Sequence, residues 1–269
     1  MSSVDREHLE AARVAAKEAG QILMEGFGRH PRVYYKGRID LVTDLDRRSE
    51  AAIVAFLHRR FPDYTILSEE GQGVEGKGEG RWIVDPLDGT TNYAHAFPIF
   101  SVSIALEHQG GLRCGVVYDP LREEWFTAVR GRGAYLNDQP VHVSDTDRLQ
   151  EALLATGFPY DMKESPENNL THFHNFSMRA QAVRRPGVAS IDLAYVAAGR
   201  LDGFWEFKLK PWDIAAGALL VTEAGGTVSD FAGGPLDIFR AEIVASNSHI
   251  HQPMLEVLSL PPTVTSPGQ

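Results

Sequence analysis

Two aspartates that follow a short apolar run are the feature of this sequence with the clearest chemical potential. The run Trp82–Val84 predicts a buried strand, and Asp85 and Asp88 come directly after it around a proline turn. A glycine and two threonines follow at positions 89–91. Carboxylates, free backbone N–H groups and hydroxyls at one strand exit can bind a divalent metal and a phosphate together. The structural alternative is an ordinary strand, turn and threonine cap.

Further acidic residues stand at the ends of other expected elements. They are the segment 40–46, the pair Glu69-Glu70 and Asp213. Each could be a solvated loop or a helix cap, and Asp213 could be a helix N-cap. The chain has no cysteine or histidine cluster, so convergent carboxylates favour a shared site for Mg²⁺ or Mn²⁺ rather than for zinc.

Several motifs together resemble those of the inositol monophosphatases, which are Mg²⁺-dependent, lithium-sensitive phosphatases. The resemblance is carried by Glu69-Glu70, by the run 85–93 (DPLDGTTNY), by Trp212-Asp213 with Gly217, and by the run 223–226 (EAGG). It extends from the N-terminal helix to about Leu258. Motifs more than a hundred residues apart occur in the family's order, so the match is specific.

The resemblance implies a role for each matching residue. Glu69, Asp85 and the Leu87 carbonyl would hold one Mg²⁺, and Asp85, Asp88 and Asp213 a second, with Glu69 reaching a third ion through waters; Mn²⁺ could substitute. Asp46 and Thr90 would orient the attacking water, with Glu69 also counted as catalytic. Substrate would contact Asp88, Gly89, Thr90, Ala189, Glu206 and Asp213, with Glu206 bonding a substrate hydroxyl. Two positions depart from the family: Val188 stands where a hydroxyl is usual in Gly-Ser/Thr-Ala-Ala, and Lys36 is one residue too close to Asp40 for a role to be assigned.

The resemblance also points to a substrate class. Relatives that act on nucleotide bisphosphates or histidinol phosphate often carry lysine where this chain has Thr91. We therefore expect a phosphomonoesterase for polyol phosphates, with inositol 1-phosphate first and fructose 1,6-bisphosphate, or dual specificity, as the alternative. A different class remains open, in which a protein of this fold acts mainly by binding other proteins.

Other phosphatase and metal chemistries fit the sequence less well. An aspartyl-phosphate mechanism would need Asp44 and Asp46 to end a strand, but Arg47 follows in an expected helix. A cysteine phosphatase would need arginine six positions after Cys114, where the chain has proline. The two histidines of the run 172–174 would face apart on a helix, which favours a surface position over a metal pair.

Composition describes an ordinary globular chain of 269 residues, 43% of them hydrophobic, with a net charge of −10 and no basic stripe. Nucleic acid is therefore an unexpected partner, and no apolar run is long enough to span a membrane. The single cysteine and the charged N-terminal helix predict a cytoplasmic protein. The family resemblance implies a homodimer.

The apolar spacing places these residues on a series of elements. Helices are expected at 5–27, 44–60, 167–182, 190–198, 214–224 and 249–258, and strands at 33–36, 64–67, 82–84, 100–107, 112–119, 124–129, 133–136, 152–156, 203–206, 226–229 and 243–245. The glycine-rich segment 71–80 is expected to be a mobile loop. Together with the resemblance, this order predicts an α/β (α+β) fold, a five-layer αβαβα sandwich. An N-terminal part (1–145) and a C-terminal part (146–258) would share the site, followed by a disordered tail (259–269).

Overall fold

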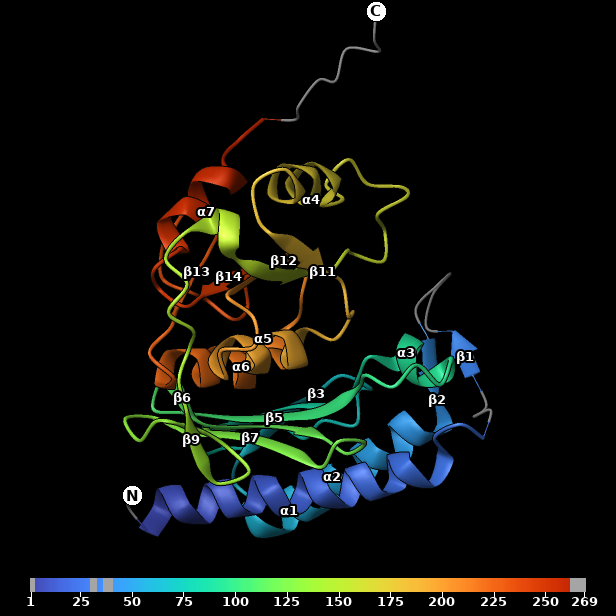
Figure 1. Cartoon of the computed structure of the whole chain (residues 1–269). Helices are drawn as coiled ribbons and strands as arrows, with labels where there is room; N and C mark the ends of the chain where they lie inside the picture. Colours follow the sequence, from blue (N-terminus) through green and yellow to red (C-terminus); the bar gives the residue numbers. More distant parts are fainter. Residues whose placement is uncertain (1–2, 30–32, 36–40, 262–269) are drawn as a thin grey trace, which may run out of the picture.

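The chain folds into alternating layers of helices and sheets, in the order α-β-α-β-α (Figure 1). The computed structural model describes residues 3–29, 33–35 and 41–261. The elements are α1 (Ser3–Gly26), β1 (Val33–Tyr35), β2 (Leu41–Thr43), α2 (Asp44–Arg60), β3 (Thr65–Ser68), β4 (Gly80–Asp88), α3 (Thr90–Ala94), β5 (Ser101–His108), β6 (Gly111–Asp119), β7 (Glu124–Val129), β8 (Ala134–Leu136), β9 (Gln139–Val141), β10 (Leu153–Thr156), α4 (Leu170–Ser177), β11 (Ala182–Arg184), α5 (Ala189–Ala197), β12 (Gly203–Phe207), α6 (Pro211–Glu223), β13 (Thr227–Ser229), β14 (Glu242–Ser246) and α7 (His251–Leu258), with a short 3₁₀ turn at Leu149–Glu151.

Helices α1 and α2 form the first layer and cover one face of the larger sheet. The apolar stripe of α1, which includes Ala12, Ala16, Ala19 and Leu23, is fully buried against that sheet. Residues at spacings of three and four lie on one helix face. Because most of them are alanines, the helix packs closely against the sheet.

The larger sheet has seven strands in the order β3-β4-β5-β6-β7-β8-β9. Strands β4 to β9 form an antiparallel meander, in which β4 to β8 coincide with predicted strands and β9 was not predicted, and β3 pairs with β4 in parallel. Short turns connect the meander, whereas β4 leaves the sheet towards α3. The register between β4 and β5 shifts between Asp85 and Asp88, so a bulge marks the strand exit that carries both aspartates.

The middle layer, α5 and α6, packs against both sheets and so joins the two halves of the molecule. Its side chains share one core with Ile83 and Phe126 of the seven-stranded sheet and with Phe204 and Ile243 of the smaller sheet. The smaller sheet has five strands in the order β11-β10-β12-β14-β13, and α4 and α7 cover its outer face. The five-layer sandwich predicted from the sequence is confirmed.

One predicted helix was wrong over half its length. The chain is helical only from Leu170 to Ser177, and Ala182–Arg184 forms the edge strand β11, parallel to β10. Phe176 stacks on Trp205 with the ring centroids 3.9 Å apart, which holds α4 on the sheet. Pairing with a distant strand therefore decides the conformation of residues 182–184, and helical spacing does not.

The segment 71–80 is tied to β3 by its backbone. Val74 exchanges two backbone hydrogen bonds with Ile66, and the Gly76 N–H donates to Thr65 Oγ1 at 3.1 Å. A Cβ at Gly76 would meet the Asp63 carbonyl oxygen at 2.4 Å, so glycine is needed for this close approach. Lys36, Asp40 and most of the expected tail lie outside the described residues.

Candidate active site

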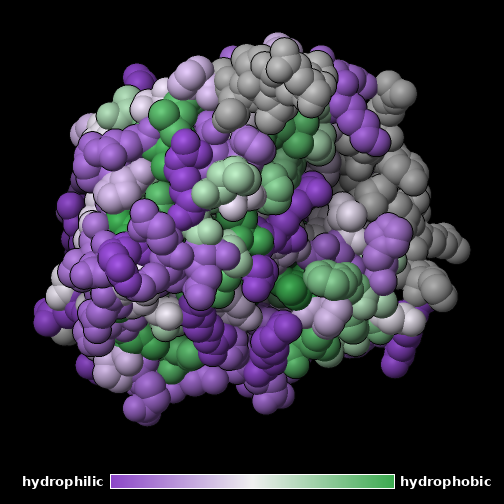
Figure 2. Space-filling view, turned by 45° about the horizontal axis from the view of Figure 1, so that its top comes forward, coloured by the Kyte–Doolittle hydropathy of each residue, from purple (hydrophilic) through white to green (hydrophobic). Residues whose placement is uncertain are grey.

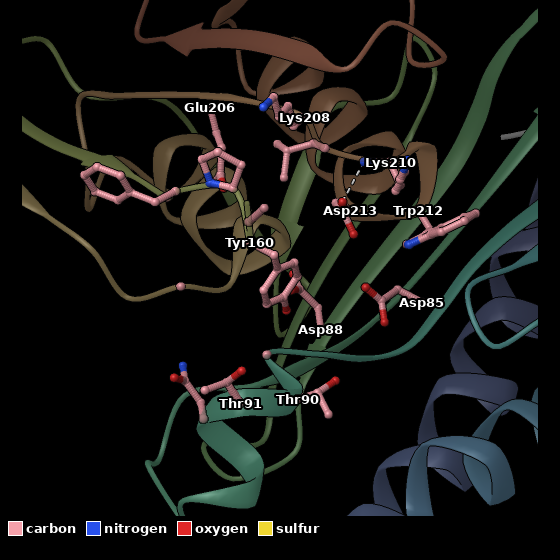
Figure 3. A pocket seen from close by; sticks show the side chains of 18 of the residues that line it. Asp85, Asp88, Thr90, Thr91, Tyr160, Glu206, Lys208, Lys210, Trp212 and Asp213 are labelled. Carbon is pink, nitrogen blue, oxygen red and sulfur yellow. Dashed lines mark hydrogen bonds between the residues drawn. The ribbon is translucent and has the colours of Figure 1, made fainter. Parts of the chain in front are cut away.

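A cavity of about 700 Å³ opens where β4 meets the N-terminal ends of α3, α5 and α6 (Figure 3). Among the residues that line it are Glu69, Asp85, Leu87, Asp88, Gly89, Thr90, Ala189, Glu206 and Asp213, which are all the predicted site residues except Asp46. Segments more than a hundred residues apart in the sequence thus meet at one point. On the face shown in Figure 2, hydrophilic residues predominate and hydrophobic ones form separate small areas.

Asp85 and Asp88 are fixed by the turn that ends β4. Asp85 is 2% exposed, and its Oδ1 accepts the Leu87 N–H at 3.0 Å. Asp88 Oδ2 accepts both the N–H and the hydroxyl of Ser190, at 2.8 and 2.6 Å. Each carboxylate is therefore held through one oxygen by groups of the protein.

Asp213 lies in the first turn of α6, two residues after Pro211. Its Oδ2 accepts the Lys210 N–H at 2.7 Å, which satisfies a donor at the helix start. It is therefore the third residue of the helix and not its N-cap. In Figure 3 the carboxylates of Asp85, Asp88 and Asp213 lie around a common space.

The carboxylates of the cavity oppose one another's ionisation. Burial raises the pKa of Asp85 well above its ordinary value, and the nearby charges of Glu69, Asp88 and Asp213 raise it further. Burial likewise raises the pKa of Asp213, with Asp88 as the next contribution. Burial also raises the pKa of Asp88 to about 6 and that of Glu206 to about 8. Such a cluster is stable in its ionised form only with positive charge among its members.

This electrostatic arrangement predicts an unusual pH dependence of stability in the absence of metal. Each raised pKa means that the folded protein keeps a proton that the unfolded chain has released, so stability falls as pH rises between the two pKa values. For Asp88 that window runs from 3.8 to about 6, and for Glu206 from 4.5 to about 8. The thermal midpoint in a chelator should therefore decrease from about pH 4 to about pH 8, and Mg²⁺ should oppose the decrease. Differential scanning fluorimetry measures the thermal midpoint at each pH. If the Asp88→Asn variant showed the same decrease of the midpoint with pH, Asp88 would not contribute to it.

Thr90 and Asp46 form a buried pair on one side of the cavity. The Thr90 hydroxyl lies 3.0 Å from Asp46 Oδ1 and 3.1 Å from the Leu87 carbonyl oxygen, and it can donate to either. Asp46 is fully buried, and its Oδ2 accepts the backbone N–H of Thr43 at 3.0 Å and the Thr43 hydroxyl in the capping box of α2. Asp46 therefore does not line the cavity but contacts Thr90, which does.

Glu206 is the last buried residue of β12 and lies on the opposite side of the cavity. It is 9% exposed. A Cβ at Gly157 would lie 2.2 Å from its Oε1, so only glycine at 157 leaves room for this carboxylate. Arg185, which stacks over the Phe158 ring at 4.6 Å, partly offsets the burial of Glu206 by lowering its pKa.

Sequence reasoning missed several residues of the cavity. Arg185, Lys208 and Lys210 line it and bring positive charge to a site otherwise rich in carboxylates, and the exposed Tyr160 lines it as well. Lys208 Nζ contacts Asp161 at 2.7 Å and Ser165 at 2.9 Å. A pattern of isolated basic residues carries no signal in the sequence, because only the fold brings them to the cavity.

The donor set of the cavity fits a hard divalent cation. Four carboxylates and a backbone carbonyl are oxygen ligands of the kind that Mg²⁺ uses, and repulsion among these carboxylates adds to burial in raising the pKa of Asp85 and of Asp213. Within the described part of the chain, no three such side chains are arranged closely enough to surround an ion as they stand. Asp88 and Asp213 instead each use one carboxylate oxygen to accept a backbone N–H at the start of α5 and of α6, respectively.

Two other candidates from the sequence are not part of this cavity. His172 is half-buried and packs edge-on against Phe231, whereas His174 on the same helix is exposed. Cys114 is buried in the core, and burial raises the pKa of its thiol to about 12. No helix of the described residues has both the length and the apolar character needed to cross a membrane.

Comparison with known proteins agrees with the geometry. The model of the inositol monophosphatase family matches residues 5–259. The chain is 46% identical to the Nus factor SuhB of Pseudomonas aeruginosa over 95% of its own length and 98% of that protein, and 45% identical to the inositol-1-monophosphatase of Synechocystis over 94% and 89%. The solved structure of an inositol monophosphatase from Anabaena superimposes with a TM-score of 0.88 at 42% identity, over 96% of this chain and 98% of that one. The chain belongs to the inositol monophosphatase family.

Proposed function

We propose that this protein is a Mg²⁺-dependent phosphomonoesterase that hydrolyses a small polyol phosphate, most favourably inositol 1-phosphate. The observation that carries the proposal is the meeting of Glu69, Asp85, Asp88 and Asp213 in one cavity with the start of α3. Family membership and the inositol-1-monophosphatases among the relatives support it.

The proposed ligand set has two parts. Glu69, Asp85 and the Leu87 carbonyl would hold one Mg²⁺, and Asp85, Asp88 and Asp213 a second, with Glu69 serving a third ion through waters. When bound, these ions supply charge neutralisation of the phosphate dianion and activation of water. Mn²⁺ would fit the same oxygen donors.

The chain's own groups orient the reactants. Backbone N–H groups of Gly89 and Thr90, at the sharp turn where Gly89 adopts φ 95°, would donate to phosphate oxygens. The Thr90 hydroxyl can direct its hydrogen to Asp46 Oδ1, which leaves an oxygen lone pair to accept a hydrogen from the attacking water. Asp46 thus sets the direction in which Thr90 polarises that water.

Glu206 is proposed to select the substrate through a hydroxyl of the polyol. Glu206→Gln should change the ratio of kcat/KM between inositol 1-phosphate and fructose 1,6-bisphosphate by up to about tenfold, with little change in the Mg²⁺ requirement, because a hydrogen bond between neutral partners is worth about 0.5–1.5 kcal/mol. Gly157→Ala should act similarly, since its Cβ would displace the same carboxylate. Steady-state kinetics on both substrates measures the ratio, and an equal loss on both would count against this role.

Fructose 1,6-bisphosphate is the alternative substrate, favoured by the basic residues Arg185, Lys208 and Lys210 at the cavity. A second phosphate on the substrate could pair with them. The decisive experiment is a phosphate-release panel with Mg²⁺, with and without Li⁺, on inositol 1-phosphate, fructose 1,6-bisphosphate, histidinol phosphate and adenosine 3′,5′-bisphosphate. Release that is strongest from inositol 1-phosphate and inhibited by Li⁺ supports the proposal, and no release from any of them refutes it.

A regulatory role is the second candidate, because the relative with 46% identity is named a Nus factor. Such a role would depend on protein contacts and not on the cavity, so an Asp85→Asn variant would keep it. A complementation assay that separates regulation from phosphate release would distinguish the two. We also propose a homodimer located in the cytoplasm, which sedimentation and fractionation would test.

A further inference from the structure

Helix α5 begins without the usual cap from its own sequence. The N-cap residue is Val188, with φ −143° and ψ 93°, and no side chain caps the helix from that position. Serine, threonine, aspartate or asparagine commonly stands there, because a side-chain oxygen can accept the N–H of the second or third helical residue. Val188 is instead 1% exposed, and its Cγ2 would lie 2.7 Å from a Cβ built at Gly89. The position is used for packing against the turn that follows Asp88.

The missing acceptor is supplied by a residue 102 positions earlier in the chain. Asp88 Oδ2 accepts the N–H of Ser190, the second residue of α5, at 2.8 Å. The same oxygen accepts the Ser190 hydroxyl at 2.6 Å. A carboxylate at a helix N-terminus is favourable because the free N–H groups carry partial positive charge. Asp88 therefore caps α5, and Ser190 adds a second bond to the same oxygen.

A third group fixes the direction of this hydrogen bond. Ser101 Oγ lies 2.7 Å from Ser190 Oγ, and both serines are fully buried. An ionised carboxylate can only accept, so the single hydroxyl hydrogen of Ser190 points to Asp88. Ser101 must then donate to Ser190. Since Ser101 faces Asp88 across the β4–β5 ladder, the chain Ser101–Ser190–Asp88 closes a ring across two strands and a helix.

We propose that Ser190 is a positioning residue, which holds the Asp88 carboxylate in the orientation needed for metal binding, with Ser101 supporting it. The inference rests on the proposed role of Asp88 as a ligand. Two hydrogen bonds to Asp88 Oδ2 limit the rotation of the carboxylate group. The direction of Asp88 Oδ1 is thereby fixed as well. Mg²⁺ tolerates little deviation from its preferred geometry, so a partner that orients a ligand affects affinity. The helix itself does not require this hydroxyl, because alanine is the better helix former.

The test is a titration of the full-length protein with Mn²⁺ in the absence of substrate. Electron paramagnetic resonance measures the concentration of free Mn²⁺ at each step. Ser190→Ala should weaken Mn²⁺ binding by about 10- to 100-fold and lower kcat/KM in proportion, as is typical when a partner of a metal ligand is lost. Ser101→Ala should have a smaller effect. The double variant should resemble Ser190→Ala alone, because Ser101 acts only through Ser190.

Ser49→Ala is the matched control, since Ser49 is also fully buried and donates to the Ala19 carbonyl between α1 and α2, away from the cavity. It should leave Mn²⁺ binding unchanged. If Ser190→Ala fails to fold, Ser101→Ala carries the test, and an affinity equal to that of the unmodified protein would overturn the proposal. So would normal Mn²⁺ binding by a folded Ser190→Ala, or no Mn²⁺ binding by the unmodified protein. Weakened Mn²⁺ binding in a protein that releases no phosphate would support the positioning role while refuting the proposed activity.

Discussion

Replacing Asp85 by asparagine is expected to lower kcat by about 10²- to 10³-fold, the usual cost of removing one preorganised electrostatic group. Asp85 is the proposed ligand shared by both ions, and it is almost completely buried beside Glu69, Asp88 and Asp213. The same change removes one member of a repulsive cluster. Without metal, the variant should therefore be as stable as the unmodified protein or more so. Steady-state kinetics and thermal melting in a chelator and in Mg²⁺ measure both effects.

Asp202→Asn is a matched control for that variant. Asp202 is 7% exposed and accepts the Ser144 hydroxyl and the Leu153 N–H, at 2.5 and 2.6 Å, away from the cavity. Its replacement should lower stability and leave kcat and the Mg²⁺ requirement unchanged. An Asp85→Asn variant that kept near-normal turnover would remove this residue from the ligand set.

Replacing Thr90 by valine is expected to lower kcat by about 10²- to 10⁴-fold, the range for loss of a group that assists proton transfer. Valine has nearly the shape of threonine, so the packing at this buried position is preserved. KM and the Mg²⁺ requirement should change little, because the proposed ligands are untouched. The loss of the Thr90 donor to Asp46 should also lower stability by about 1–3 kcal/mol.

Thr91→Val provides the control for this second prediction. Thr91 is the next residue of α3, lines the same cavity and is exposed. The Thr91→Val variant should keep a kcat within about threefold of that of the unmodified protein. If Thr90→Val and Thr91→Val had the same kcat, the proposed role of the Thr90–Asp46 pair would be wrong.

Local patterns predicted most of the secondary structure because they report burial directly. The spacing of apolar residues located α1 and α2 to within two residues, and strand-like runs separated by turns located β4 to β8 but not β9. The error in the helix predicted for residues 167–182 has a different origin. Residues 182–184 form a strand because β10 is beside them, and a pairing partner some thirty residues away leaves no mark on the local pattern.

The candidate site shows the same division. Nine of the ten predicted site residues line one cavity, and Asp46 lies behind Thr90. These residues were recognisable because short motifs surround them. The basic residues Arg185, Lys208 and Lys210 were not, since none belongs to a motif and each reaches the cavity only through the fold.

The sequence alone determined the family, the layered fold and the identity of the acidic residues, because chemical type and spacing are local properties of the chain. Tertiary structure decided how Asp88 is held. Asp88 caps a helix a hundred residues later, and Ser101 and Ser190 meet although 89 positions separate them. Such contacts depend on the distance between two surfaces that approach only after both sheets have packed on α5 and α6, and no local pattern encodes that distance.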